Sequence, residues 1–392
     1  MTYRRKDGRK TTLRQAWLCP RLISALSLLI THFSFLISAL LMTACSSSDP
    51  TEEPQPGQQK QTMLTIYVYS PEHPIMTRAD VGPVDATEAE SKVTLLQIWV
   101  YDKDGKKVGY LRTEETATLN GGEGAVYQIP VPDDFAQNKP NVDVYVLANI
   151  TYNNTFTETT SRTDLLDNAK IPTGKYGLSP LTTTVPDDGL PMAGVLKDQP
   201  VIGDAPVLRI GTSSNIATVP LTRAVSKLRF VFANTTGDQT LSITGISLNS
   251  GMIPNEEYLF PQGQSLTYNS AVASLLSSPI AEVAKKDNPA IYVYNGQTAQ
   301  AYETLLNDAG LTQTDPIYLR ESDKKIEGTI TYKVDNVAQT PATFRMTAAG
   351  DFLRNHSWIV YAYYEGLSGM QISIVDVTPW EDRNGNHTTY NW

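Results

Sequence analysis

Val93-Thr94-Leu95-Leu96-Gln97-Ile98-Trp99-Val100-Tyr101 is a run of aliphatic and aromatic side chains, several of them β-branched. Such a run is typical of a β-strand. It leads into Asp102-Lys103-Asp104-Gly105-Lys106-Lys107, after which residues 108–111 resume the apolar pattern. A calcium loop would need further oxygen ligands and a distal Glu where Lys106 and Lys107 stand. The Asp-Gly pair therefore predicts a hairpin turn between two antiparallel strands.

Similar runs lie on both sides of this hairpin. Upstream, Met63-Leu64-Thr65-Ile66-Tyr67-Val68-Tyr69 is rich in β-branched and aromatic residues and ends at Ser70-Pro71. Downstream, residues 125–131 and 142–149 predict strands, residues 163–169 are a helical candidate, and residues 174–200 are rich in loop residues. Short strands separated by turn residues predict an antiparallel sandwich.

The second half repeats this pattern. A short helix is expected at residues 300–309, and strands are expected at residues 217–221, 225–232, 241–248, 290–294, 316–320, 328–334, 342–346, 357–364 and 370–377. The sequence therefore predicts an all-β chain with few short helices. We expect two antiparallel β-sandwich domains in tandem, of transthyretin-like or Greek-key type, over residues 62–208 and 209–392.

The N-terminal stretch is a targeting segment. Seven Lys and Arg residues precede an apolar run, which ends in Leu41-Met42-Thr43-Ala44-Cys45. A membrane span would have comparable length, but small Thr43 and Ala44 before a cysteine suit a lipoprotein peptidase, and the motif resembles a lipobox. We therefore expect a signal peptide over residues 1–44, lipid on Cys45, and a flexible tether over residues 45–61.

Composition limits the partners of the mature chain. The signal peptide removes 7 of 32 Lys and Arg and 1 of 41 Asp and Glu, which changes the net charge from -9 to -15. Such an acidic chain lacks the basic patch that nucleic acid requires. It also lacks a polybasic face for the membrane surface, and its membrane contact is therefore expected through lipid. Cys19 leaves with the signal peptide and Cys45 is acylated, which leaves no cysteine for a disulfide or a metal.

A polar loop follows the first predicted strand. Residues 72–89 lie in a region punctuated by three prolines, with Arg78 at its middle in Thr77-Arg78-Ala79. Most loop arginines are only solvated, but an arginine in an exposed loop is also where a trypsin-like protease cuts. Arg78 and Ala79 are therefore candidate processing residues.

The sequence does not indicate an enzyme. His73, His356 and His387 lack metal-ligand spacing, and no nucleophile elbow or phosphate loop occurs. The Asp133-Asp134 and Asp187-Asp188 pairs follow Val-Pro and predict ordinary turns. No cofactor or metal site is expected. A glycan-binding lipoprotein would use exposed aromatic rings; we expect Trp99 and Trp358 in the core, while Trp380 fits either place.

Several motifs together resemble those of FimA-like and Mfa-like fimbrillins, the lipoprotein-derived subunits of type V pili in anaerobic Gram-negative bacteria. The resemblance covers nearly the whole mature chain and rests on the order of its motifs. These are the lipobox at Cys45, Thr77-Arg78-Ala79, residues 96–105 with the hairpin turn, Val144-Tyr145-Val146-Leu147-Ala148-Asn149, Leu190-Pro191-Met192, residues 221–228, Leu353-Arg354-Asn355-His356 and Thr378-Pro379-Trp380.

The resemblance implies assembly by strand exchange at the cell surface. It implies an outer-membrane lipoprotein precursor that a trypsin-like arginine protease cuts after Arg78. The first strand, with Met63, Leu64, Ile66 and Val68, then departs, and a strand of another fimbrial subunit takes its place. The polar tail, residues 381–392, is short for a donor, although Thr388, Tyr390 and Trp392 alternate. Stalk, anchor and tip roles in adhesion stay open, and a surface glycan-binding lipoprotein is the alternative.

Overall fold

The computed structural model describes residues 61–69, 87–120, 124–152, 156–270, 272–296, 299–346 and 352–376. They belong to one compact unit, Lys60–Trp392. The predicted signal peptide, Cys45 and all but the last residue of the tether lie outside the described residues, as do Arg78, Ala79 and everything from residue 377 onward. No helix within the described ranges is long and apolar enough to cross a membrane.

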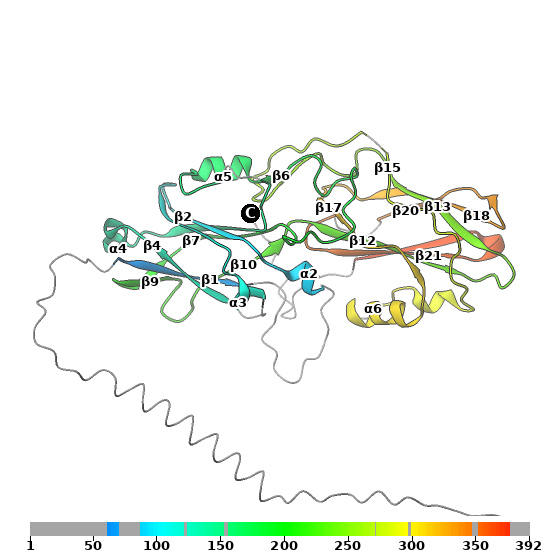
Figure 1. Ribbon diagram of the computed structural model, residues 1–392, viewed down its shortest axis with the longest axis horizontal. Helices are drawn as coiled ribbons and strands as arrows, with labels where there is room; N and C mark the ends of the chain where they lie inside the picture. The colour runs from blue at the N-terminus through cyan, green and yellow to red at the C-terminus, as the bar shows by residue number, and fades with distance from the viewer. Residues whose placement is uncertain are drawn as a thin grey trace, which may run out of the picture. The chain divides into compact units, whose positions relative to one another are not determined.

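Strands dominate the described chain and form β-sandwiches, which confirms the all-β prediction. The first sandwich has one sheet in the order β10-β1-β9-β8, with β4 along the other edge of β1, and a second sheet in the order β11-β7-β5-β2-β3 (Figure 1). Its strands are β1 Met63–Tyr69, β2 Leu96–Asp102, β3 Lys107–Thr113, β4 Ala125–Pro130, β5 Val142–Ala148, β7 Met192–Gln199, β8 Val201–Asp204, β9 Val207–Ile210, β10 Thr218–Pro220 and β11 Thr222–Arg223.

The alternation of side chains explains how these two sheets pack. In β4, Ala125, Tyr127 and Ile129 are buried while the residues between them are exposed, as expected for a sheet with one covered face. β2 is buried on both faces: Ile98 belongs to the core between the two sheets, whereas Trp99 belongs to a second apolar cluster on the opposite face. The predicted hairpin is confirmed, since β2 and β3 pair antiparallel and Gly105 has a φ of 82°.

Short helices accompany the first sandwich. They are α2 Glu88–Ser91, α3 Ala117–Asn120, α4 Asp133–Asn138 and α5 Arg162–Asn168. The helix expected at residues 163–169 is confirmed as α5, where the Ser161 side chain accepts a hydrogen bond from the Asp164 N–H at 3.0 Å and caps the first turn.

The second sandwich has sheets β16-β12-β21-β22 and β15-β13-β18-β19, with β17 beside β12 and β20 beside β18. Its core lies between these sheets, and α6 packs on the outer side of β12 and β21. The elements are β12 Ser226–Asn234, β13 Leu241–Leu248, β15 Ala273–Ser274, η1 Pro289–Tyr292, α6 Ala299–Asp308, β16 Thr312–Gln313, β17 Ile317–Leu319, β18 Glu327–Val334, β19 Val337–Ala338, β20 Ala342–Arg345, β21 Ser357–Tyr364, η2 Gly366–Ser368 and β22 Met370–Asp376.

The two sandwiches are joined by buried contacts. β6, Lys170–Ile171, precedes β7 in the chain and pairs with β14, Glu257–Tyr258, which follows β13. Leu259, Phe260 and Tyr318 from the second half pack in the same apolar cluster as Trp99 and Tyr145. β10 and β11 pair within the first sandwich, so its sheets extend to Arg223, beyond the boundary expected after residue 208.

Four local predictions were wrong. The strand expected at residues 290–294 is absent: Pro289–Tyr292 form the 3-10 helix η1, because Pro289 favours a first helical turn. Residues 192–199, expected as loop, are β7, and Asp133-Asp134 opens α4 rather than a plain turn. The loop predicted to extend to residue 89 already contains the start of α2.

Candidate strand-exchange groove

β1 lies inside its sheet rather than at an edge. On one side it pairs antiparallel with β4, where Leu64 lies opposite Ile129 and Val68 opposite Ala125. On the other side it pairs parallel with two strands in succession: residues 63–65 with β9 and residues 67–69 with β10. Both edges of β1 are therefore occupied along its length.

Backbone hydrogen bonds hold β1 at both ends. The Met63 N–H donates to the Pro206 carbonyl at 2.9 Å, and the Thr62 carbonyl accepts from the Val131 N–H at 3.0 Å. At the other end, the Tyr69 carbonyl accepts from the Leu221 N–H at 2.9 Å. Removing β1 would leave backbone donors and acceptors of β4, β9 and β10 without partners, and another β-strand is the natural replacement.

The inner face of β1 fills an apolar slot. Leu64, Ile66 and Val68 are 0, 1 and 0% exposed and pack in the core between the two sheets. Of the four residues predicted as the detachable strand, these three point into the core, whereas Met63 is half-buried and lies on the opposite face. The slot therefore accepts alternate apolar residues of one strand.

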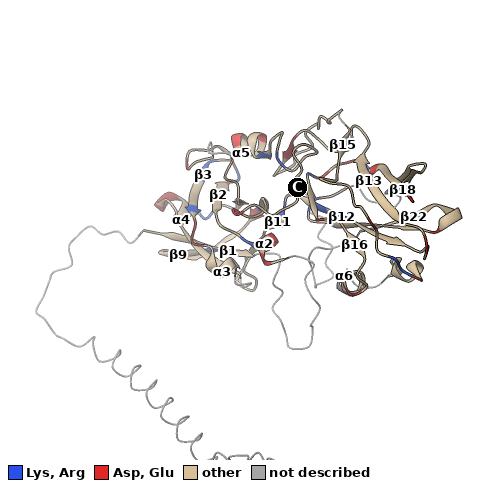
Figure 2. Ribbon diagram, turned by 45° about the vertical axis from the view of Figure 1, so that its right-hand side comes forward, with Lys and Arg blue, Asp and Glu red and all other residues tan. Residues whose placement is uncertain are grey.

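The outer face of β1 is uncharged and partly covered. β1 contains no charged residue and is tan throughout in Figure 2. Tyr67 is half-buried and lies opposite Val126, which is 52% exposed; Met63 lies opposite Val207, which is 53% exposed. The outer surface around β1 therefore carries apolar side chains as well.

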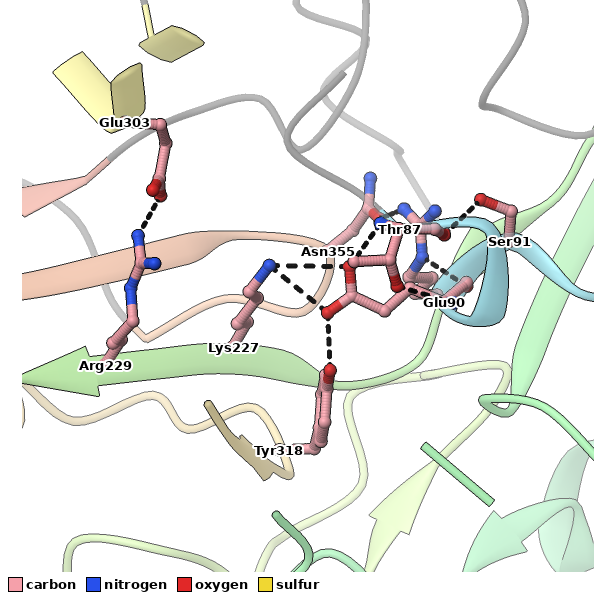
Figure 3. Close-up of polar contacts among 9 residues, drawn as sticks. Thr87, Glu90, Ser91, Lys227, Arg229, Glu303, Tyr318 and Asn355 are labelled. Atoms are coloured by element: carbon pink, nitrogen blue, oxygen red, sulfur yellow. Dashed lines mark hydrogen bonds and ion pairs between the residues drawn. The ribbon is translucent and has the colours of Figure 1, made fainter. Parts of the chain in front are cut away.

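A buried polar cluster holds α2, the first described element after β1 (Figure 3). The Glu90 carboxylate accepts hydrogen bonds from the Tyr318 hydroxyl and from the Thr87 N–H, the latter at 2.7 Å. It also forms an ion pair with Lys227 at 3.2 Å between Nζ and Oε1. Tyr318 and Lys227 belong to β17 and β12 of the second sandwich. Glu90 is only 1% exposed.

Arg223 connects the same cluster to both sandwiches. It lies on β11, is 0% exposed, and donates from Nε to the Glu90 carbonyl at 2.9 Å. Its Nη1 donates to Oδ1 of Asn355 at 3.2 Å, in the segment that leads into β21. We refer to Thr87, Glu90, Arg223, Lys227 and Tyr318 as the Glu90 cluster.

A second charged cluster is buried beside β14. Glu257 forms an ion pair with Arg354 at 2.8 Å and accepts a hydrogen bond from the Glu321 N–H at 2.8 Å. Arg354 also binds Glu321 and donates to the Tyr258 carbonyl at 2.7 Å. Burial raises the pKa of the Glu257 carboxyl to about 8, against the opposing charge of Arg354. Two carboxylates thus share one fully enclosed guanidinium.

A cavity beside α5 lacks the exposed aromatic platform that a glycan would need. This cavity, of about 630 Å³, is lined by Tyr152, Phe156, Thr159, Thr160, Asp164, Asn168, Lys170 and Pro172. The Phe156 ring is buried and packs edge-on against Trp99, with centroids 6.3 Å apart. Trp99 and Trp358 are 0 and 3% exposed, which confirms their predicted core positions, and Trp380 lies outside the described residues. The described residues contain no cluster of metal-binding side chains.

Sequence reasoning missed the Glu90 cluster, although a signal was present. Thr87-Glu88-Ala89-Glu90 has the spacing of a capping box, in which the two side chains bond each other's backbone N–H. Both bonds are present in α2. The cluster also explains two of the motifs noted in the sequence, since residues 221–228 supply Arg223 and Lys227, and Asn355 receives the Arg223 hydrogen bond.

Known proteins give an independent view of the chain. Residues 64–206 match the family model of the major fimbrial subunit protein (FimA), a range that begins inside β1 and ends just before β9. No curated protein matches the chain.

Solved structures resemble the chain at low sequence identity. The tip fimbrial protein Mfa3 from Porphyromonas gingivalis, with a C-terminal truncation, is 14% identical with a TM-score of 0.48, and the alignment covers 81% of this chain and 99% of that one. A candidate cell adhesion protein from Parabacteroides distasonis is 13% identical, with a TM-score of 0.47 and coverage of 81% and 98%. A candidate polysaccharide-binding protein (DUF1812) from Bacteroides thetaiotaomicron is 14% identical, with a TM-score of 0.41 and coverage of 82% and 98%. The match over residues 64–206 supports the resemblance of this chain to FimA-like and Mfa-like fimbrillins.

Proposed function

We propose that this protein is a fimbrial subunit, or a tip or anchor component, which assembles by exchange of β1 and serves cell adhesion. The match of residues 64–206 to the family model of a major fimbrial subunit supports a place in a surface fimbrium and other fimbrial subunits as partners. The family consists of structural proteins, which fits the expectation that the chain is not an enzyme.

The position of β1 is the observation that carries this proposal. β1 is bonded along both edges and buries three apolar side chains, yet it is the first described strand and only residues 70–86 join it to α2. A cut after Arg78 would break the covalent connection between β1 and α2. A donor strand with alternating apolar residues would then satisfy the same backbone groups and the same slot.

The strength of the interaction supports exchange rather than simple loss. Seven strand residues that bury about 300 Å² of apolar surface contribute on the order of 7 kcal/mol before ordering costs. An empty groove is therefore unfavourable, and a subunit without β1 has a strong tendency to take up another strand. This tendency drives polymerisation in the proposed mechanism.

Export and processing complete the proposal. Lipid on Cys45 holds the precursor at the outer membrane through the tether, residues 45–61. A trypsin-like arginine protease cuts between Arg78 and Ala79, and residues 45–78 remain with the lipid once β1 leaves. Replacing Cys45 by Ala removes the only thiol that survives signal cleavage, so the variant is expected to lose fatty-acid label and surface attachment.

Uptake of a labelled strand tests the exchange directly. The full chain is treated with a trypsin-like protease and then mixed with a fluorescent peptide of residues 62–70. Stable incorporation and a higher Tm are expected only after the cut, because the peptide binds the native state alone. Arg78→Ala, which keeps β1 covalently attached, is the matched control, and a peptide with Asp at positions 64, 66 and 68 should not bind.

A glycan-binding protein would respond in the opposite way. Its first strand would be permanent, so the cut chain would ignore the peptide, and an oligosaccharide would raise the Tm of the uncut chain. That pair of results would replace the present proposal with the glycan-binding alternative.

A further inference from the structure

We propose that the Glu90 cluster keeps α2 and the residues that connect it to β2 in place when β1 departs. Proteolysis then opens the groove without loosening the junction of the two sandwiches. This inference rests on the proposed function for its role in assembly. Its physical content, that Glu90 fixes α2 to the second sandwich, holds in the uncut chain as well.

The position of α2 makes retention necessary. After a cut at Arg78 the new N-terminus, Ala79, would lie eight residues before Thr87, the N-cap of α2. α2 itself has four residues, and an isolated helix of that length has no stability of its own in water. Behind it, Val93 and Leu95 enter the core and lead directly into β2. Tertiary contacts must therefore fix α2, or the new terminus would fray toward β2.

Glu90 supplies these contacts from a single buried side chain. Its carboxylate is held from the helix by the Thr87 N–H and from the second sandwich by Lys227 and Tyr318. The backbone carbonyl of Glu90 accepts a hydrogen bond from Arg223, which also donates a hydrogen bond to the side chain of Asn355. A buried carboxylate in an ion pair is costly to disturb, because removing one partner leaves the other charge enclosed.

The contacts that hold Glu90 do not come from β1. All of its members lie after residue 86, and β1 contributes none of the contacts to Glu90. The same partners therefore remain available when β1 has gone. This independence separates the part of the chain that exchanges from the part that stays.

Hydrogen exchange and trypsin together test the role of Glu90. In the uncut full chain, Glu90→Ala is expected to speed amide exchange at Ser91 and Lys92 at least about 100-fold, because their N–H groups bond only to Thr87 and Ala89 within α2. Trypsin should then cut after Lys92, the next basic residue beyond Arg78, and yield a fragment that begins at Val93. Wild type should resist this second cut, and Glu90→Gln should lie between wild type and Glu90→Ala, because its amide accepts at one oxygen only and leaves the Lys227 charge without a counter-ion.

Two control variants keep the result interpretable. Glu303→Ala breaks the neighbouring ion pair of Arg229 on β12, which binds α6 instead of α2 (Figure 3), and should leave Lys92 protected. Glu90→Ala combined with Lys227→Met removes the isolated lysine charge and should still expose Lys92, so that misfolding is not mistaken for release of α2.

The outcomes separate this inference from the proposed function. If Lys92 stays protected and exchange is unchanged in Glu90→Ala, the role of Glu90 is refuted, whether or not Arg78 is cut. If Arg78 is never cut but α2 loosens in Glu90→Ala, the retention of α2 stands and the processing step of the proposed function fails.

Discussion

Glu257 is the residue whose environment departs most from that of an ordinary surface carboxylate. It lies on β14 and is fully enclosed, and burial raises its pKa from 4.5 to about 8 even though Arg354 lies 2.8 Å away. Glu321 accounts for part of this shift, because a second carboxylate competes for the same guanidinium. The protonation of Glu257 therefore affects the contact between β14 and β6, which joins the two sandwiches.

The raised pKa predicts a pH dependence of stability. The folded state keeps the Glu257 proton to higher pH than the unfolded state, so the stabilisation is complete below about pH 4.5 and is lost as the pH rises through about 8. We expect the Tm of wild type to fall between pH 5 and pH 8 relative to that of Glu257→Gln, which stays neutral throughout. Parallel Tm profiles of the two proteins would contradict this assignment.

At the scale of the element, β1 shows what a sequence can predict. Its bounds, Met63–Tyr69, agree with the prediction because strand propensity and the following Ser-Pro both act locally. That β1 lies between β4 and two parallel partners could not be predicted, since pairing depends on strands more than 50 residues away. β7 was missed because Gly194 weakens its strand pattern, whereas the structure needs glycine there: a Cβ would lie 2.4 Å from the Pro220 carbonyl oxygen.

The buried face of β1 predicts the effect of a cavity. Ile66→Ala should lower the free energy of unfolding of the full chain by about 3 kcal/mol, because the side chain is 1% exposed in the core. After the cut at Arg78, the same variant should release β1 faster. Chemical unfolding and the dissociation rate of the cut strand measure the two effects.

Val126→Ala is the matched control for that experiment. Val126 lies on the adjacent β4 but is 52% exposed, so its truncation should change the stability by no more than about 0.5 kcal/mol. Equal losses in the two variants would show that the inner face of β1 is not a special part of the core.

For the whole molecule, the shared apolar cluster makes the two sandwiches interdependent. Phe260, from the second half, packs edge-on against Tyr145 of β5, with ring centroids 5.1 Å apart, and both are buried. Arg320 adds hydrogen bonds to the carbonyls of Pro172 and Lys175 across the same junction. The sequence indicated two sandwiches from length and repeated strands, but gave no sign that their junction would be a core in its own right.

This junction predicts cooperative unfolding. Calorimetry of wild type should show one transition, whereas Phe260→Ala should lower the stability by about 3–5 kcal/mol and separate the unfolding of the two sandwiches. Phe344→Ala creates a comparable cavity within the second sandwich alone, so its single transition should move to lower temperature without splitting. Two resolved transitions in wild type would show that the sandwiches are independent.

The pairing of β1 along both of its edges also affects the timing of assembly. A cut after Arg78 breaks one peptide bond and none of the contacts that hold β1, so a nicked subunit stays closed. Once β1 has departed, its return becomes a bimolecular event that depends on concentration. Under the proposed mechanism, nicking and elongation are therefore separate in time: cells can stockpile nicked subunits that do not react with one another, and the competition between strands, not the protease, sets the pace of growth.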